Sequence, residues 1–219
     1  MGCRRLTSLV VLFHGYASNG ADIRRHVAPA LVGFDVEVAA LDGPEEAQLK
    51  PGTRQWFGIT GIEGEGFRRA APAVQIAIDK IAEIQDRVGA EDKSTLLVGF
   101  SQGGVVAAAV AAAVPVAVEV VAICAPLPRA LLDEYALPQS PPLWALFGGR
   151  DRFVLRTREE LPVSGPVHAV HFPAMGHEIG EEALEVVRHR VASLVARRAA
   201  AVMDPLAPFL AHRPPGPSR

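Results

Sequence analysis

The chain has 219 residues, of which 49% are hydrophobic and 21% are charged, which is enough apolar material for one sizeable core. Its 22 basic and 24 acidic residues give a formal net charge of −2, so no basic surface for nucleic acid is indicated. Two cysteines form neither a disulfide framework nor a metal-binding pattern. Cys124 ends an apolar run, and we expect it to be a buried small hydrophobic residue.

The apolar stretch from Leu6 to Phe13 is too short to span a membrane, and no small-residue cleavage site follows it. We interpret it as the first strand of the core and not as a secretion signal. The expectation is a cytoplasmic protein without stable membrane insertion.

Short apolar runs alternate along the chain with longer helical patterns, an order typical of a parallel sheet covered by helices on both faces. The runs are solidly Val, Leu and Ile, which predicts strands buried on both sides. The six predicted strands are Ser8–Phe13, Val36–Leu41, Thr95–Phe100, Val118–Ile123, Leu143–Phe147 and Val167–Phe172.

Three longer segments predict helices. Apolar residues recur at three- and four-residue steps from about Glu65 to Val88, and the segment from Ser101 through Val114 is apolar nearly all round, which indicates a central, buried helix. A last helix is predicted from Gly180 to about Ala200. Residues 1–200 therefore form a single α/β domain without a large cap domain, and residues 201–219, rich in proline, are expected to be a mobile tail.

The motif Gly99-Phe100-Ser101-Gln102-Gly103-Gly104 lies directly between a predicted strand and a predicted helix. A sharp turn there exposes the serine hydroxyl, and the glycines leave room for the turn and for close helix packing. This arrangement is the nucleophile elbow of serine hydrolases, so Ser101 is the candidate nucleophile.

A serine nucleophile needs a base and an acid that orients the base. Asp151 and His177 follow two later predicted strands, in the chain order that this class of hydrolase uses. Asp133 and Glu134 are the best competing acids, although no glycine-framed turn precedes them. The remaining histidines are weaker candidates. His26 lies in a helical stretch between the first two predicted strands, and the others lie in the loop after the first strand, in the last predicted strand, in the last helix or in the tail: His14, His168, His171, His189 and His212.

Two backbone N–H groups are needed for the oxyanion, one from the residue after the nucleophile and one from a loop after an earlier strand. Gln102 and Tyr16 are the expected donors, because glycines in the loop after Phe13 allow amides to point inward. His14 in the same loop is expected to be a buried histidine that ties the loop together.

These motifs, with Phe13-His14-Gly15, Gln55-Trp56-Phe57 and Gly176-His177, resemble the carboxylesterase/acyl-protein thioesterase group of α/β hydrolases over residues 7 to 198. The resemblance implies an α/β-hydrolase fold with a mostly parallel, doubly wound sheet, and hydrolysis of carboxylic esters or thioesters without a cofactor. It also implies that Trp56 and Phe57, in an otherwise irregular segment from Asp42 to Gly64, line the acyl pocket.

The sequence departs from the family pattern in two places. Gly58 stands where the family usually has Asp, and the segment between Asp151 and His177 is short. We expect these departures to affect the pocket rim and the preferred acyl length, leaving the triad intact.

The favoured hypothesis is a serine hydrolase that cleaves small-molecule esters of short to medium acyl chains through an acyl-enzyme. A thioesterase or lysophospholipase acting on longer acyl chains is the alternative. A non-catalytic binding protein on the same scaffold is disfavoured, because no member of the triad is missing.

Overall fold

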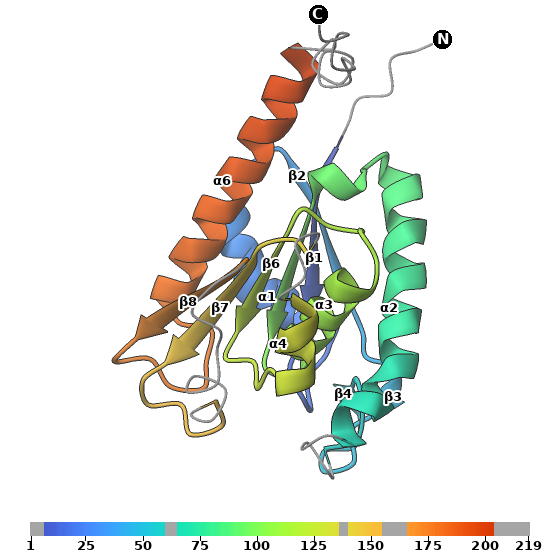
Figure 1. Ribbon diagram of the computed structural model, residues 1–219, viewed down its shortest axis with the longest axis vertical. Coiled ribbons are helices and arrows are strands. Elements are labelled where there is room, and N and C mark those ends of the chain that lie inside the picture. The colour runs from blue at the N-terminus through green and yellow to red at the C-terminus, as the bar shows by residue number, and fades with distance from the viewer. Residues whose placement is uncertain (1–6, 60–64, 136–139, 155–165, 204–219) are drawn as a thin grey trace, which may run out of the picture.

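A computed structural model describes residues 7–59, 65–135, 140–154 and 166–203, so nearly all of the expected tail lies outside the described residues. Its centre is a six-stranded sheet in the order β2-β1-β5-β6-β7-β8, and every neighbouring pair is parallel (Figure 1). The six predicted strands are confirmed with small shifts at their ends. They are β1 (Ser8–Phe13), β2 (Val36–Leu41), β5 (Thr95–Phe100), β6 (Glu119–Ile123), β7 (Leu143–Gly148) and β8 (Val167–Phe172).

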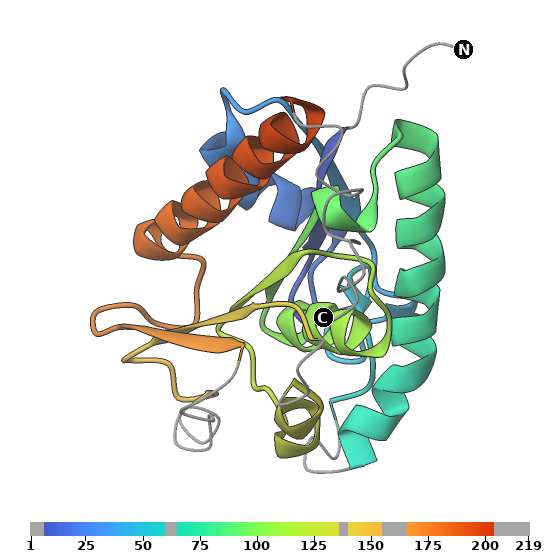
Figure 2. The same ribbon diagram turned by 45° about the horizontal axis from the view of Figure 1, so that its top comes forward.

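Helices cover both faces of the sheet, as Figure 2 shows with the top of the molecule turned forward. On one face lie α1 (Gly20–Val27) and α6 (Glu181–Met203). On the other lie α2 (Glu65–Val88), α3 (Gln102–Ala113) and α4 (Arg129–Tyr135). In the described ranges no segment builds a cap domain over the sheet, which agrees with the predicted α/β-hydrolase architecture.

Successive side chains along each strand point to opposite faces of the sheet, so the core consists of two layers. In β1, Leu9, Val11 and Phe13 join the layer under α2 and α3, whereas Val10 and Leu12 join the layer under α1 and α6. The expectation that all six strands are buried on both sides is wrong for the edge strands β2 and β8, where several residues stay exposed. An edge strand has one neighbour only, and the helices lie over the middle of the sheet.

The segment from Asp42 to Gly64 is irregular where described, apart from a two-stranded antiparallel pair, β3 (Glu45–Glu46) and β4 (Arg54–Gln55). Arg54 fixes this segment: its guanidinium donates to the carbonyl oxygens of Gly43 at 2.8 Å and Pro44 at 2.6 Å. Its backbone N–H also donates to the Ser18 carbonyl at 2.7 Å. The loops after β1 and β2 are thus joined at the carboxyl end of the sheet.

Helix α3 packs against the sheet with almost no space between the two backbones. A Cβ on Gly99 would overlap the Gly103 carbonyl, and a Cβ on Gly103 would overlap the carbonyl oxygens of Phe13 and His14. A Cβ on Gly104 would come within 2.7 Å of the Ala125 Cβ. Only glycines allow α3 to begin this close to β5 and to the loop after β1.

We expect Gly103→Ala to lower the free energy of unfolding by about 1–3 kcal/mol, because the added methyl group meets backbone atoms that must move as a unit. Gly58→Ala is the matched control, since a Cβ there would find its nearest neighbour at 3.5 Å, an ordinary contact. Urea denaturation of both variants measures the difference. Equal stability of the two variants would contradict the close-packing argument.

Candidate active site

Ser101 occupies the turn between β5 and α3 with φ of 51° and ψ of −121°. A positive φ is costly for a residue with a Cβ, and it persists here because the surrounding backbone leaves no other path. The turn also places the Ser101 N–H against the carbonyl of Ile123 in the next strand, at 2.8 Å. The Ser101 hydroxyl consequently stands clear of the helix at the carboxyl edge of the sheet.

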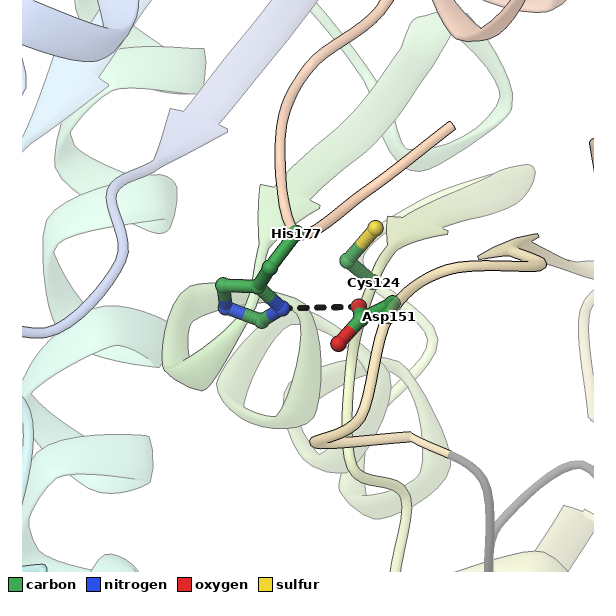
Figure 3. Close-up of side chains that lie close together, drawn as sticks. All are labelled: Cys124, Asp151 and His177. Carbon is green, nitrogen blue, oxygen red and sulfur yellow. Dashed lines mark hydrogen bonds and ion pairs between the residues drawn. The ribbon is translucent and has the colours of Figure 1, made fainter. Parts of the chain in front are cut away.

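The structure brings Ser101, His177 and Asp151 together from the ends of three strands. His177 Nε2 lies 3.0 Å from Ser101 Oγ. His177 Nδ1 lies 2.7 Å from Asp151 Oδ2, the contact drawn in Figure 3. With the carboxylate beside Nδ1, the proton of the neutral ring belongs on Nδ1, and Nε2 is left to accept from the serine hydroxyl. The geometry forms one continuous hydrogen-bonded chain from acid to hydroxyl.

The Asp151 side chain is fully buried, and both of its oxygens have partners. Oδ2 accepts from His177, and Oδ1 accepts from the backbone N–H of Phe153 at 2.9 Å. These two bonds satisfy the buried charge and fix the carboxylate in the orientation that the imidazole needs.

The loops that carry the acid and the base are bonded to each other through their backbones. The Arg150 N–H donates to the Met175 carbonyl at 3.0 Å, and the Gly149 N–H donates to the Phe172 carbonyl at 2.8 Å. A Cβ on Gly148 would overlap the carbonyl oxygens of Met175 and Gly176. The distance between Asp151 and His177 is therefore set by main-chain contacts.

Cys124 lies directly beside the Asp151–His177 pair at the end of β6 (Figure 3). It is fully buried, as expected, and its Sγ lies 3.5 Å from the Gly176 carbonyl oxygen and 3.6 Å from that of Glu178. Burial raises the pKa of the Cys124 thiol to about 12, so the group is a neutral S–H donor to the loop of His177. A thiol in this state is no competing nucleophile.

Cys124, Asp151 and His177 are also the one cluster, among the described residues, whose ligand atoms lie close enough for a metal ion, within 4.8 Å of one another. Within this cluster, Asp151 Oδ2 and His177 Nδ1 are 2.7 Å apart, which is a hydrogen-bond distance. Two ligands of one tetrahedral zinc ion, each bound at about 2.0–2.2 Å, lie farther apart than that. The cluster fits a proton between acid and base better than it fits a metal.

The expected oxyanion donors, Tyr16 and Gln102, line the same cavity as Ser101. Gln102 is the first residue of α3, where a backbone N–H has no partner within the helix. The loop that carries Tyr16 lies close to Ser101: a Cβ added to the preceding Gly15 would be 3.5 Å from the Ser101 Cβ.

His14 ties this loop together, as expected. Its Nδ1 lies 2.6 Å from the Gly15 carbonyl oxygen, and its Nε2 accepts from the Gly43 N–H at 2.9 Å. This pattern requires the neutral ring with its proton on Nδ1. Burial lowers the pKa of His14 below its ordinary value and keeps the ring neutral, although the bond to Gly15 partly opposes the shift.

Trp56 and Phe57 lie in different environments. Phe57 lines the cavity, but Trp56 is 1% exposed and does not line it. The Trp56 ring packs against Phe13 and His14, and its Nε1–H donates to the His14 carbonyl at 2.9 Å. The expectation that both aromatic residues face the pocket is corrected for Trp56, which lies behind the cavity wall.

The side chain of Gln102 holds the Trp56–Phe57 segment, a contact that the sequence did not indicate. Its Oε1 accepts from the Trp56 N–H at 2.9 Å, and its Nε2 donates to the Phe57 carbonyl at 2.6 Å. One residue therefore presents a backbone amide beside Ser101 and fixes a wall of the cavity with its side chain.

The cavity beside Ser101 has a volume of about 460 Å³, within the usual range for small-molecule sites. Its lining is almost entirely apolar, and the described residues that line it include no Asp, Glu, Lys or Arg. Six further residues line the cavity, and the sequence analysis gave none of them a role in the pocket: Ile59, Phe100, Val105, Pro126, Pro128 and Phe153. Position in the chain offered one signal for five of them, which adjoin the elbow, the end of β6 or the acid, whereas Ile59 follows the Trp56–Phe57 pair.

The competing candidates lie elsewhere. Asp133 pairs with Arg129 at 2.8 Å on an exposed face of α4, and the side chain of Glu134 lies outside the described residues. His168 stacks on Trp144, with ring centroids 4.5 Å apart. His26 and His189 are exposed on α1 and α6, and His212 falls outside the described ranges.

Comparison with known proteins agrees with this geometry. A family model described as phospholipase/carboxylesterase matches residues 2–194. The chain belongs to this family of hydrolases. Esterase YpfH of Escherichia coli (strain K12) is 31% identical over 101 residues, which make up 44% of this chain and 42% of that relative. The match therefore spans less than half of the relative's length.

Several solved structures share the fold of this chain. Esterase PE8 superposes with a TM-score of 0.76 at 22% identity, covering 89% of this chain and 96% of the other. Zea mays acyl-protein thioesterase 2 gives a TM-score of 0.67 at 17% identity, covering 87% and 94%. The Bacillus cereus carboxylesterase gives 0.62 at 14% identity, covering 86% and 89%. At these identities the likeness establishes the α/β fold alone.

In the part of the chain that the structure describes, no helix is both long and apolar enough to cross a membrane.

His14 predicts a pH dependence of stability. Its pKa is lower in the folded chain than the ordinary 6.5, so between these two values the unfolded chain binds more protons and the free energy of unfolding falls as the pH falls. We expect the wild type to lose stability below about pH 6.5, with a limiting slope of about 1.4 kcal/mol per pH unit that His14→Gln lacks. Denaturation at several pH values measures both slopes; parallel slopes would contradict a buried neutral His14.

Proposed function

We propose that this protein is a serine hydrolase that cleaves carboxylic esters through an acyl-enzyme intermediate. The observation that carries the proposal is the hydrogen-bonded chain from Asp151 through His177 to Ser101, with distances of 2.7 Å and 3.0 Å. Ser101, the last member of this hydrogen-bonded series, lines a cavity able to hold a small substrate and lies on a nucleophile elbow.

In the first half-reaction, Ser101 Oγ attacks the ester carbonyl carbon while His177 Nε2 takes the hydroxyl proton. Asp151 stabilises the imidazolium and holds its orientation. The backbone N–H groups of Gln102 and Tyr16 donate to the carbonyl oxygen as it becomes negative, and the N-terminus of α3 adds a favourable dipole. When the tetrahedral intermediate collapses, His177 returns the proton to the leaving alkoxide, and the acyl group stays on Ser101.

In the second half-reaction, His177 removes a proton from water, and the resulting hydroxide attacks the acyl-enzyme carbonyl. Collapse of this intermediate expels Ser101 Oγ, which recovers its proton from His177. One ester and one water yield one carboxylic acid and one alcohol, and no cofactor takes part.

The cavity supports a neutral, apolar acyl group as the substrate portion. Phe57, Val105 and the other described wall residues offer contacts to hydrocarbon, and none of these described residues is an Asp, Glu, Lys or Arg that could pair with an ionised group. Short to medium acyl chains suit a cavity of about 460 Å³ that opens without a cap domain in the described ranges. Thioesters with the same acyl groups would undergo the same two steps, and a matched ester and thioester panel compares them.

Substitution of the three residues tests these roles. Ser101→Ala and His177→Ala should each lower kcat by about 10⁶-fold, because nucleophile and base act as one unit. Asp151→Asn should lower it by about 10⁴-fold, since the amide favours the wrong imidazole tautomer.

Asp133→Asn is the matched control, because Asp133 is an exposed acid paired with Arg129 on the surface of α4. Steady-state hydrolysis of p-nitrophenyl esters provides the rates, and circular dichroism confirms that each variant is folded. A crippled Asp133→Asn variant together with a nearly active Asp151→Asn variant would overturn the assignment of the acid.

A further inference from the structure

Phe153 is a large apolar side chain that the fold leaves in water. It is 73% exposed, yet it lies two residues from the buried Asp151 and forms part of the wall of the cavity. Exposure of a phenyl ring at this point gives up the stabilisation that burial would provide, and exposed apolar surface beside a cavity often marks a binding site.

The exposure of Phe153 is not the result of a loose attachment. Its backbone N–H donates to Asp151 Oδ1 at 2.9 Å, and the next residue, Val154, is buried in the core at 1% exposure. The ring is therefore presented from a backbone that is fixed on both sides. A bound group meets a preformed surface, with little ordering cost for the protein.

The Phe153 ring continues the apolar wall up to the reacting groups. Its centroid lies 4.8 Å from that of the His177 ring, and the interplanar angle is 57°. The same imidazole has its Nε2 3.0 Å from Ser101 Oγ, and all three side chains line one cavity. An acyl group attached at Ser101 can cover the phenyl ring if its chain extends along this wall, whereas an acetyl group has a single carbon beyond the carbonyl with which to do so.

The shortened segment between Asp151 and His177 gave reason to expect a weaker wall on this side of the pocket. Phe153 belongs to this segment, and most of its surface is exposed for a substrate to cover. Phe57, Pro126 and Pro128 line the same cavity, so the substrate would meet apolar side chains from two other segments of the chain as well as Phe153.

We propose that Phe153 is a specificity-determining residue that selects acyl groups long enough to cover its ring. The inference rests on the proposed ester hydrolysis at Ser101. A butanoyl or longer chain removes the ring from water and gains binding free energy, which an acetyl ester lacks. Because the gain is made with the part of the substrate remote from the carbonyl, it appears as a dependence of kcat/KM on acyl length.

The test compares p-nitrophenyl acetate, butanoate and octanoate on the wild type, Phe153→Ala and Phe153→Leu. Phe153→Ala should lower the octanoate-to-acetate ratio of kcat/KM by about tenfold, while kcat/KM for acetate changes by less than about threefold. Phe153→Leu should keep the ratio within about threefold of the wild type, since leucine restores most of the apolar surface. Val32→Ala is the matched control, because Val32 is 77% exposed and does not line the cavity.

Each other outcome contradicts the inference in a different way. Equal losses on acetate and octanoate would mean that the ring acts only by holding His177, and an unchanged ratio would mean that the acyl chain never reaches it. A series of alkyl acetates is run in parallel. If Phe153→Ala changes the dependence of kcat/KM on the length of the alkyl group, the ring selects the alcohol portion instead of the acyl group. Ser101→Ala is included so that a failure of the proposed function is recognised separately: full activity in that variant overturns ester hydrolysis at Ser101 and this inference with it.

Discussion

Residue 101 adopts a backbone conformation with φ of 51°, which a serine keeps only when its surroundings impose it. The tight turn forms because Gly99 and Gly103 have no side chains, so α3 can begin directly against β5 and the loop after β1. The same close approach sets three other features. It directs the hydroxyl toward His177, places the Gln102 N–H in the first turn of α3, where it has no partner within the helix, and lets the Gln102 side chain reach the Trp56–Phe57 segment.

The other half of the site depends on how two neighbouring loops meet. Main-chain bonds join the turn after β7 to the loop after β8, and the glycine at position 148 removes the side chain that would separate them. Cys124 supports the loop after β8 as a protonated thiol that donates to its carbonyl oxygens. Ser101 and His177 join the two halves through their 3.0 Å contact, and the Phe100 ring next to the elbow also packs against the imidazole, with ring centroids 5.1 Å apart. A displacement of either half would therefore change the position of the imidazole relative to the hydroxyl.

The strands and the candidate triad could be predicted because local signals agree with the fold. Short apolar runs between helical patterns mark strands whose carboxyl ends hold loops, and Ser101, Asp151 and His177 follow three of those runs in the expected order. Trp56 could not be placed in this way, because its burial depends on Phe13 and His14, which are distant in sequence. Exposure at β2 and β8 depends on strand order, and the exposed ring of Phe153 depends on how the acid turn meets the cavity. Composition does not encode either.

The central claim is that the Ser101 hydroxyl is made nucleophilic by its hydrogen-bonded chain to His177 and Asp151. Labelling with a fluorophosphonate, followed by peptide mass spectrometry, tests it most directly, because the reagent forms a stable adduct only with an activated serine. The account predicts a single adduct on the peptide that contains Ser101, formed far more slowly in His177→Ala. An adduct on a different serine, or labelling of Ser101 at the same rate without His177, would contradict it.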